Sequence, residues 1–258
     1  MVWRCMLLCV LAGGLALGGG GCRKSEPAAS QPAPAELVML CGASFLGPVE
    51  ALCKQFTQET GLAVVISSGE SEDLLPLVKV GRKGDLFVTH DPYREYVRQA
   101  GALADSVQVG VLAPAVVVQK GNPKGIVRFE DLARPGLRVA FTDPKYSTCG
   151  ELVMALLEKK GIQDAVMKNV DTRLTRGHAN LGTMLKTQVV DAVIMWKAVA
   201  RTFADSAEVV DTPYEYDRDV AVHLMALSHS RQGEALKKFI QFARQRGPRV
   251  FAEHGYVK

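Results

Sequence analysis

The chain has 258 residues, 48% of them hydrophobic and 22% charged, which is the composition of a folded globular protein with a sizeable core and excludes an intrinsically disordered one. Its formal net charge is only +4 and its basic residues form no continuous run, so nucleic-acid binding is not indicated.

Residues 1–22 have the pattern of a signal peptide. Arg4 precedes an apolar segment and then small residues that end at Cys22, and the stretch is too short to span a bilayer. A cysteine directly after small residues resembles a bacterial lipobox, in which Cys22 is lipidated and becomes the mature N-terminus; ordinary cleavage nearby is the alternative. Residues 23–35 are polar with three prolines, which is typical of an extended tether. We therefore expect a lipid-anchored domain in the periplasm or at the outer face of the cytoplasmic membrane.

The first structural unit covers residues 36–61. Residues 37–41 are apolar, as in a buried strand, and Gly42 and Ser44 interrupt them. Apolar residues then recur at helical spacing up to Gly61, which fits a helix C-cap. The loop therefore faces a helix N-terminus, where unpaired N–H groups and about half a positive charge favour an anion, and the Ser44 hydroxyl is well placed to help hold it.

A similar unit follows directly. Residues 62–66 predict a second strand, which leads into a hydroxyl-rich turn containing Ser71; helix capping is the alternative role for this serine. Residues 85–89 predict a third strand, followed by His90, which either faces the ligand or makes local bonds. Strands that alternate with helices predict an α/β fold with doubly wound, mainly parallel sheets and with ligand-binding loops at the carboxyl ends of the strands.

The pattern restarts in the second half of the chain. From residue 137 a strand, a hydroxyl-rich loop ending at Cys149 and a helix follow one another, and a fourth loop ends at His178 where another helix begins. Residues 192–196 predict a buried strand.

Two segments have the pattern of crossovers between lobes. Residues 109–120 are apolar and β-branched over an unusual length with Pro114 inside, which suits a crossover better than a central strand, and a return crossover begins at residue 220. We predict a first lobe from residues 36–112 and 222–258 and a second lobe from residues 113–221.

Four loops thus combine small or hydroxyl residues with a helix start, two in each predicted lobe. If they converge on one cleft, they surround a small oxyanion with neutral donors.

Metal and nucleotide chemistry find little support in the sequence. The five histidines never occur at ligand spacing, no CxxC is present, and neither a P-loop nor a dinucleotide-binding glycine motif occurs. Cys41 and Cys53 fit core positions. A thiol at a helix start has a lowered pKa, so a cysteine-dependent enzyme, or thiol-based metal or metalloid binding, through Cys149 and His178 is the alternative function.

The chain resembles the periplasmic molybdate-binding proteins of ABC importers, in the type II solute-binding group. The similarity covers most of residues 36–258 and is carried by ASF (43–45), FTQETG (56–61), GDLFVTHD (84–91), VQKGNP (118–123), TDP (142–144), VDAVIMW (190–196) and the terminal AEHGY. The resemblance implies two α/β lobes, joined by two strands, that close on a tetrahedral oxyanion bound by hydroxyls and backbone N–H groups.

The resemblance also implies site residues. Ser44 and Ser71 match the serines of the first two loops, Cys149 stands where the family has a small residue that donates its backbone N–H, and His178 falls near the fourth-loop position with the same role. Trp196 stands where the family has a tyrosine whose hydroxyl reaches the anion, and its indole N–H is a replacement donor.

Two acids depart from the family pattern. Glu70 and Glu72 flank Ser71 where small or neutral residues are usual. An acid inside the cleft favours a protonated ligand because it can accept the ligand's proton, whereas a pocket of donors alone favours a fully ionised dianion.

The sequence therefore predicts a solute-binding protein that captures a small tetrahedral oxyanion, with molybdate or tungstate the leading ligands by resemblance. Its partners are expected to be a membrane permease and an ATPase, and the membrane itself through the lipid anchor. We expect a monomer without cofactor, metal or catalytic residues.

Overall fold

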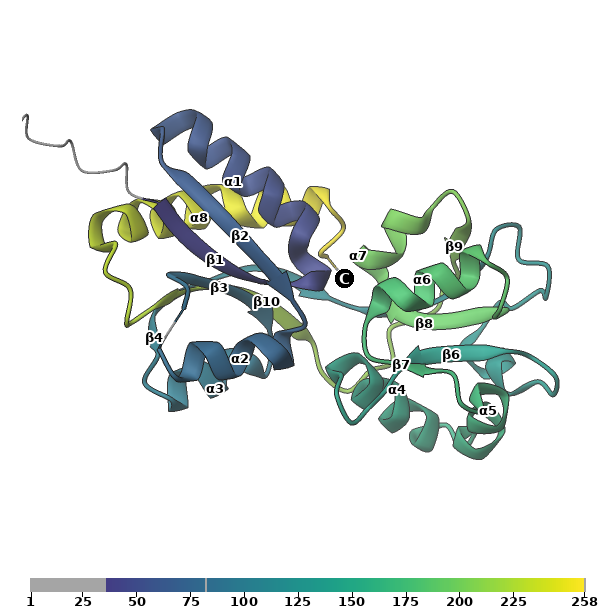
Figure 1. Ribbon diagram of the computed structural model, residues 1–258. Coiled ribbons are helices and arrows are strands. Elements are labelled where there is room, and N and C mark those ends of the chain that lie inside the picture. The colour runs from purple at the N-terminus through teal and green to yellow at the C-terminus, as the bar shows by residue number, and fades with distance from the viewer. Residues whose placement is uncertain (1–35, 82, 258) are drawn as a thin grey trace, which may run out of the picture. The chain divides into compact units, whose positions relative to one another are not determined.

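The computed structural model describes residues 36–81 and 83–257, so the expectations for the signal peptide, Cys22 and the tether lie outside the described residues. This part of the chain forms two five-stranded sheets with helices around each (Figure 1). No helix within it combines the length and the apolar character that crossing a membrane requires. The predicted α/β architecture of two lobes is confirmed.

The first lobe is built on a sheet with the strand order β2-β1-β3-β10-β4. Its strands are β1 (Glu36–Gly42), β2 (Ala63–Gly69), β3 (Leu86–His90), β4 (Leu103–Leu112) and β10 (Val220–Leu227). Its helices are the short 3-10 turn η1 (Ala43–Phe45), α1 (Leu46–Thr60), α2 (Ser71–Lys79), α3 (Tyr93–Gln99) and α8 (Gly233–Glu253).

These helices cover both faces of the first sheet (Figure 1). Helices α1 and α8 lie together on one face, where the Phe56 ring packs against Phe239 and Phe242 at centroid distances of 4.8 and 5.4 Å. Helices α2 and α3 lie on the other face, over a second apolar cluster that includes Leu74 and Val97. The predicted cap of α1 is confirmed, since Gly61 follows the helix with φ +73°.

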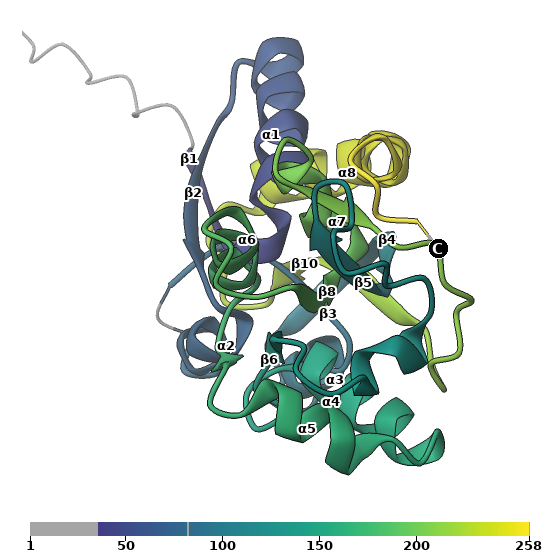
Figure 2. The same cartoon turned by 90° about the vertical axis from the view of Figure 1, so that its right-hand side faces the viewer.

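The second lobe has a sheet of the order β7-β6-β8-β5-β9. Its strands are β5 (Pro114–Gln119), β6 (Val139–Thr142), β7 (Leu174–Thr175), β8 (Ala192–Trp196) and β9 (Ala207–Val209). Its helices are η2 (Phe129–Ala133), α4 (Thr148–Lys159), α5 (Gln163–Val170), α6 (His178–Lys186), α7 (Lys197–Ala200) and η3 (Arg201–Phe203). Helices α4 and α5 lie on one side of this sheet and α6 and α7 on the other (Figures 1 and 2).

Both sheets are mixed, and they are mixed in the same way. In the first, β1 runs parallel to β2 and β3, whereas β10 runs antiparallel to both of its neighbours. In the second, β6 runs parallel to β7 and β8, whereas β5 is the reversed strand. Each sheet therefore has four strands in one direction and one against them, so the carboxyl ends of the parallel strands in each lobe gather at one edge.

The first crossover differs in detail from the expected single strand. The sequence pattern suggested one long strand interrupted by Pro114, but β4 ends at Leu112 and β5 begins at Pro114. A proline cannot donate to a ladder, and the first position of a strand is one of the few places where it is tolerated. The return connection, residues 210–219, is free of regular structure and leads into β10.

Candidate anion-binding cleft

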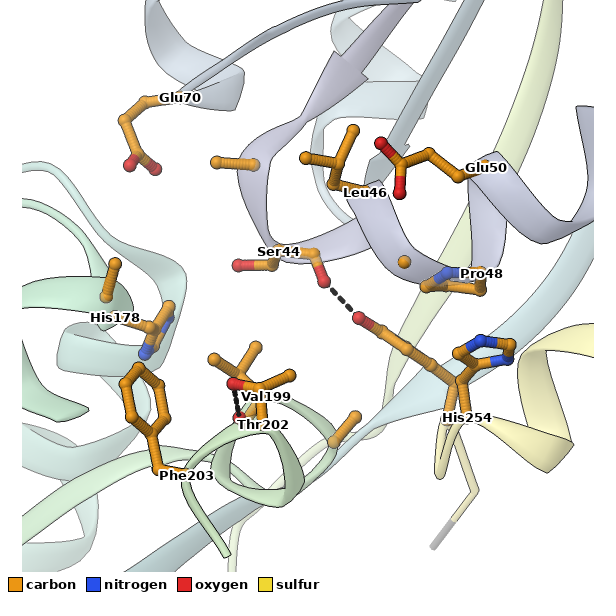
Figure 3. A pocket seen from close by; sticks show the side chains of 15 residues that line it. Ser44, Leu46, Pro48, Glu50, Glu70, His178, Val199, Thr202, Phe203 and His254 are labelled. Atoms are coloured by element: carbon orange, nitrogen blue, oxygen red, sulfur yellow. Dashed lines mark hydrogen bonds between the residues drawn. The ribbon is translucent and has the colours of Figure 1, made fainter. Parts of the chain in front are cut away.

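Loops from the carboxyl ends of strands in both lobes meet in a narrow cleft. Its lining consists of Ala43, Ser44, Phe45, Glu70, Ser71, Glu72, His90 and Tyr93 from the first lobe and Tyr146, Ser147, Thr148, Arg176, His178 and Trp196 from the second. The free space is only about 20 Å³, which is room for about one water molecule. A wider cavity of about 330 Å³ adjoins it and shares Ala43, Ser44, Glu70 and His178 (Figure 3).

The loop after β1 brings Ser44 to this cleft. The Ser44 carbonyl accepts a hydrogen bond from the Tyr256 hydroxyl, which ties the loop to the C-terminal segment (Figure 3). A Cβ at Gly42 would lie 2.7 Å from the Ser71 hydroxyl oxygen and 3.0 Å from the Phe45 ring. Only glycine therefore lets the first two loops approach this closely.

Ser71 is oriented by a partner that the sequence did not reveal. This serine is the first residue of α2 and is 6% exposed, and its oxygen accepts a hydrogen bond of 2.7 Å from the hydroxyl of the fully buried Thr89 on β3. The two hydroxyls share one hydrogen bond, so the pair retains one hydroxyl hydrogen for another acceptor. Ser71 is not the N-cap of α2, since Glu70 holds that position and its side chain makes no capping bond, although Glu72 and Asp73 do place acids in the first turn.

The second lobe contributes the starts of α4 and α6. Ser147 and Thr148 line the cleft at the N-terminus of α4, which has twelve residues, and His178 is the first residue of α6. The first backbone N–H groups of a helix have no partner inside it, so both helix starts present donors and partial positive charge to the cleft.

His90, His178 and Trp196 form an aromatic cluster across the lobes. The Trp196 ring lies 5.8 Å from the His90 ring and 5.5 Å from the His178 ring between centroids. Burial lowers the pKa of His90 to about 4 and that of His178 to about 3, so both rings are neutral at pH 7. The cleft thus gains hydrogen-bonding groups from these histidines but no positive charge.

The charged groups of the cleft are two acids and one arginine. Burial raises the pKa of both glutamates of the cleft, Glu70 and Glu72. For Glu70 the neighbouring charges of Glu72 and Asp73 raise the pKa further. Arg176, from the loop before α6, reaches Asp73 at 3.1 Å and Glu72 at 3.6 Å. These ion pairs link the two lobes at the rim of the cleft.

The structure brings together four of the five residues expected to bind ligand, namely Ser44, Ser71, His178 and Trp196. Cys149 is absent from the lining and is fully buried, and burial raises the pKa of its thiol, opposite to the lowering expected for a reactive cysteine. Whether its backbone N–H or these four residues contact a ligand stays a prediction.

The alternative function through Cys149 and His178 finds no support in this geometry. A thiol with a raised pKa is a poor nucleophile at neutral pH. Among the residues that the structure describes, no group of three or more His, Cys, Asp or Glu side chains is placed to hold a metal ion. Cys41 and Cys53 are also free and buried, as expected for core positions.

Sequence reasoning missed Thr89, Tyr93 and Tyr146 as members of the site. Thr89 lies at the end of an apolar run that is typical of an ordinary buried strand, so nothing in the neighbouring sequence indicates its contact with Ser71. Both alternatives for His90 are found: it lines the cleft at the end of β3, and its Nδ1 atom bonds locally to the Asp91 carbonyl at 2.6 Å.

A protein of two α/β lobes with hydroxyl groups and helix starts gathered in the cleft between them has the construction of a solute-binding protein. The chain belongs to the bacterial extracellular solute-binding protein family, whose model matches residues 37–257. The family and the fold are those of solute-binding components of ABC transporters, in the type II group, as the sequence resemblance implied.

Two curated relatives align over most of their length. A putative binding protein of Haemophilus influenzae is 24% identical over 226 residues, covering 86% of this chain and 91% of that protein. The molybdate-binding protein ModA of Mycobacterium bovis is 23% identical over 259 residues, covering 96% of this chain and 95% of that protein.

Solved structures show the same fold. The periplasmic molybdate-binding protein of Azotobacter vinelandii superposes with a TM-score of 0.70 at 19% identity, covering 86% of this chain and 99% of that chain. The sulfate-binding protein SubI of Mycobacterium tuberculosis superposes with a TM-score of 0.70 at 19% identity, covering 86% of each. Because proteins named for two different anions superpose equally well, the fold alone does not select the ligand.

Proposed function

We propose that the protein captures a small tetrahedral oxyanion between its two lobes and delivers it to an ABC permease and its ATPase. One observation carries the proposal: hydroxyl groups and helix starts from four loops, two in each lobe, line a single narrow cleft. Such groups replace the hydration shell of an anion without adding a full positive charge. Similarity to molybdate-binding relatives makes molybdate and tungstate the first ligands to test.

The proposed hydroxyl donors of the first lobe are Ser44 and Ser71. The proposed donors of the second lobe are the backbone near Thr148 and Cys149, together with His178 and Trp196. Ser71 is the best-supported donor because it lines the cleft and its pair with Thr89 retains one hydroxyl hydrogen. No bond of the ligand is made or broken in this function, so no catalytic group is required.

Ligand capture requires the lobes to move. The free space of the narrow cleft is about 20 Å³, so we propose that the cleft widens to admit an anion of five heavy atoms. We propose hinge bending at the two connections, between β4 and β5 and in residues 210–219, which lie outside the strands. The open form admits the anion and the closed form satisfies donors from both lobes at once.

The proposed location is the periplasm or the outer face of the cytoplasmic membrane. Lipidation of Cys22 and a tether of residues 23–35 fit a binding protein that works beside its permease. Mass spectrometry of the chain isolated from membranes tests the anchor: a diacylglycerol adduct on Cys22 supports it, and an unmodified chain that begins elsewhere refutes it.

Calorimetric titration of the chain from residue 23 onward with molybdate, tungstate, sulfate, phosphate and arsenate tests the binding function. We expect saturable binding of at least one anion at one site per chain. From residue 23 onward Trp196 is the only tryptophan, and because it lines the cleft its fluorescence gives an independent signal.

The serine donor is tested with a matched pair of variants. Ser71→Ala removes a hydrogen bond to a charged ligand, which is worth about 1.5–3 kcal/mol, so affinity should fall by roughly 10- to 100-fold. Ser68→Ala, in the exposed strand residue three positions earlier, should leave affinity unchanged. The absence of binding by any of the five anions would refute the proposed function.

A further inference from the structure

Glu70 reaches across the cleft from one lobe to the other. It belongs to the first lobe, at the end of the β2–α2 loop, yet its Oε1 atom lies 2.6 Å from the position that a Cβ on Gly177 would occupy. Gly177 is the N-cap of α6 in the second lobe. Figure 3 shows the Glu70 carboxylate pointing into the cavity on the side of His178. A carboxylate therefore stands at one of the helix starts that face the cleft.

The Glu70 carboxylate has no direct bonding partner among the described residues. It forms no hydrogen bond or ion pair with any residue that the structure describes, while Arg176 pairs instead with Asp73 and Glu72. Burial, Glu72 and Asp73 raise the pKa of Glu70, and the positive charge of Arg176 offsets only part of this rise. Within the cleft this group is an acceptor that still needs a donor.

A second group beside it also lacks a partner. The Nδ1 atom of His178 is buried without a hydrogen-bond partner, and the residue is only 7% exposed. His178 lines both the narrow cleft and the wider cavity, as Glu70 does. Two unpartnered polar groups, contributed by different lobes at the same helix start, point to a ligand that satisfies them both.

The arrangement of donors and acceptors restricts that ligand. Ser44, Ser71 and the helix starts present donors to an anion, but Glu70 presents only acceptor oxygens when it is ionised. A fully ionised tetrahedral dianion, such as sulfate or molybdate at neutral pH, has no hydrogen to offer and meets Glu70 as a like charge. Hydrogen phosphate and hydrogen arsenate retain a hydroxyl group at the same pH and can donate it.

We propose that Glu70 makes the cleft selective for tetrahedral oxyanions that carry a proton, of the phosphate and arsenate class, by accepting that proton in a hydrogen bond. The inference rests on the proposed function and narrows its ligand class.

The test compares the wild-type chain with Glu70→Gln in titrations with phosphate, arsenate, sulfate and molybdate at pH 7.5, followed by calorimetry and Trp196 fluorescence. The wild-type chain should bind phosphate at least about tenfold more tightly than sulfate or molybdate, since a charged hydrogen bond contributes a factor of roughly 10 to 100. Glu70→Gln should weaken phosphate binding and strengthen sulfate and molybdate binding, each by about tenfold.

Glu50→Gln is the matched control, because Glu50 lines the wider cavity but not the narrow cleft. It should leave the ratio of phosphate to sulfate affinity unchanged. A wild-type chain that prefers molybdate or sulfate, or a Glu70→Gln variant that gains affinity for all four anions alike, would overturn the selectivity while leaving anion capture intact. If neither chain binds any of the four, the proposed function fails and this inference with it.

Discussion

Replacing Gly150 by alanine should destabilise the protein at the point where α4 begins. Gly150 is the third residue of this helix, and a Cβ there would lie 2.2 Å from the carbonyl oxygen of Thr142, 2.7 Å from the nitrogen of Pro144 and 2.9 Å from the carbonyl carbon of Asp143. All three are backbone atoms, so no side chain can rotate away. Relief requires α4 to move away from the loop that follows β6.

The magnitude follows from two opposing effects. Alanine in place of glycine within a helix stabilises by about 0.5–1 kcal/mol, whereas overpacking of this kind costs about 1–3 kcal/mol. The net loss should reach about 2–2.5 kcal/mol, at the upper end of the difference because the clash is with backbone atoms, and for a domain of this size this lowers Tm by roughly 4–10 °C. Because the start of α4 borders the narrow cleft, anion affinity should fall as well.

Thermal unfolding followed by circular dichroism measures the effect, with Gly233→Ala as the control. Gly233 is the first residue of α8, its φ is not positive, and a Cβ there meets nothing within 4 Å. The control should therefore be as stable as the wild-type chain or slightly more stable. Equal Tm values for the Gly150→Ala and Gly233→Ala variants would refute the reasoning.

Three further predictions concern charge, thiols and the contact between the lobes. Burial lowers the pKa of His90 to about 4, so below about pH 6.5 the unfolded chain binds a proton at this residue that the folded chain does not. The free energy of unfolding, measured with urea, should therefore fall by about 3 kcal/mol between pH 7 and pH 4 because of His90. His178, whose pKa is also lowered by burial, should add to this loss. A flat stability profile between pH 7 and 4 would contradict this. The three cysteines among the described residues are free and buried, so a thiol reagent should modify none of them in the native state and all three after denaturation. Fast labelling of one of them in the native protein would support a reactive thiol. Arg176→Met removes an exposed ion pair with Asp73 and should change the free energy of unfolding by less than about 1 kcal/mol. It should nevertheless raise the fraction of molecules with open lobes, as measured by small-angle scattering. A loss of several kcal/mol in the free energy of unfolding would mean instead that the pair stabilises the fold.

The strand–loop–helix units could be predicted because their signals are local. The apolar run before Gly42 and the helical spacing after it lie within one short segment, and they indicate a loop at Ser44. The same holds for Ser71 at the start of α2. The carboxyl ends of parallel strands then bring such loops together without any further information from the sequence.

Contacts between distant segments could not be predicted in this way. The bond from Thr89 to Ser71 joins residues 18 positions apart across two elements, and Glu70 meets Gly177 across more than 100 residues. The prediction that Cys149 lines the cleft was wrong for a geometric reason: successive side chains along a helix point in directions that differ by about 100°. The hydroxyl-rich loop indicated the right segment, but only the structure shows that Ser147 and Thr148 line the cleft and that the thiol of Cys149 packs inside.

The strand order explains how the lobes can close without disturbing either sheet. Edge strand β4 of the first lobe continues into β5, the reversed strand of the second, and edge strand β9 of the second lobe leads back to β10, the reversed strand of the first. In both crossings the chain therefore leaves an edge strand of one lobe and enters the reversed strand of the other, and both connections lie outside the hydrogen-bonded strands of the sheets. Under the proposed hinge motion, Ser44 and Ser71 can meet an anion while the cleft is open, whereas Glu70 reaches the start of α6 only when the lobes close. Glu70 moves with the first lobe, so discrimination under this proposal begins when the anion meets Ser71, and closure adds the contact of the carboxylate with the start of α6.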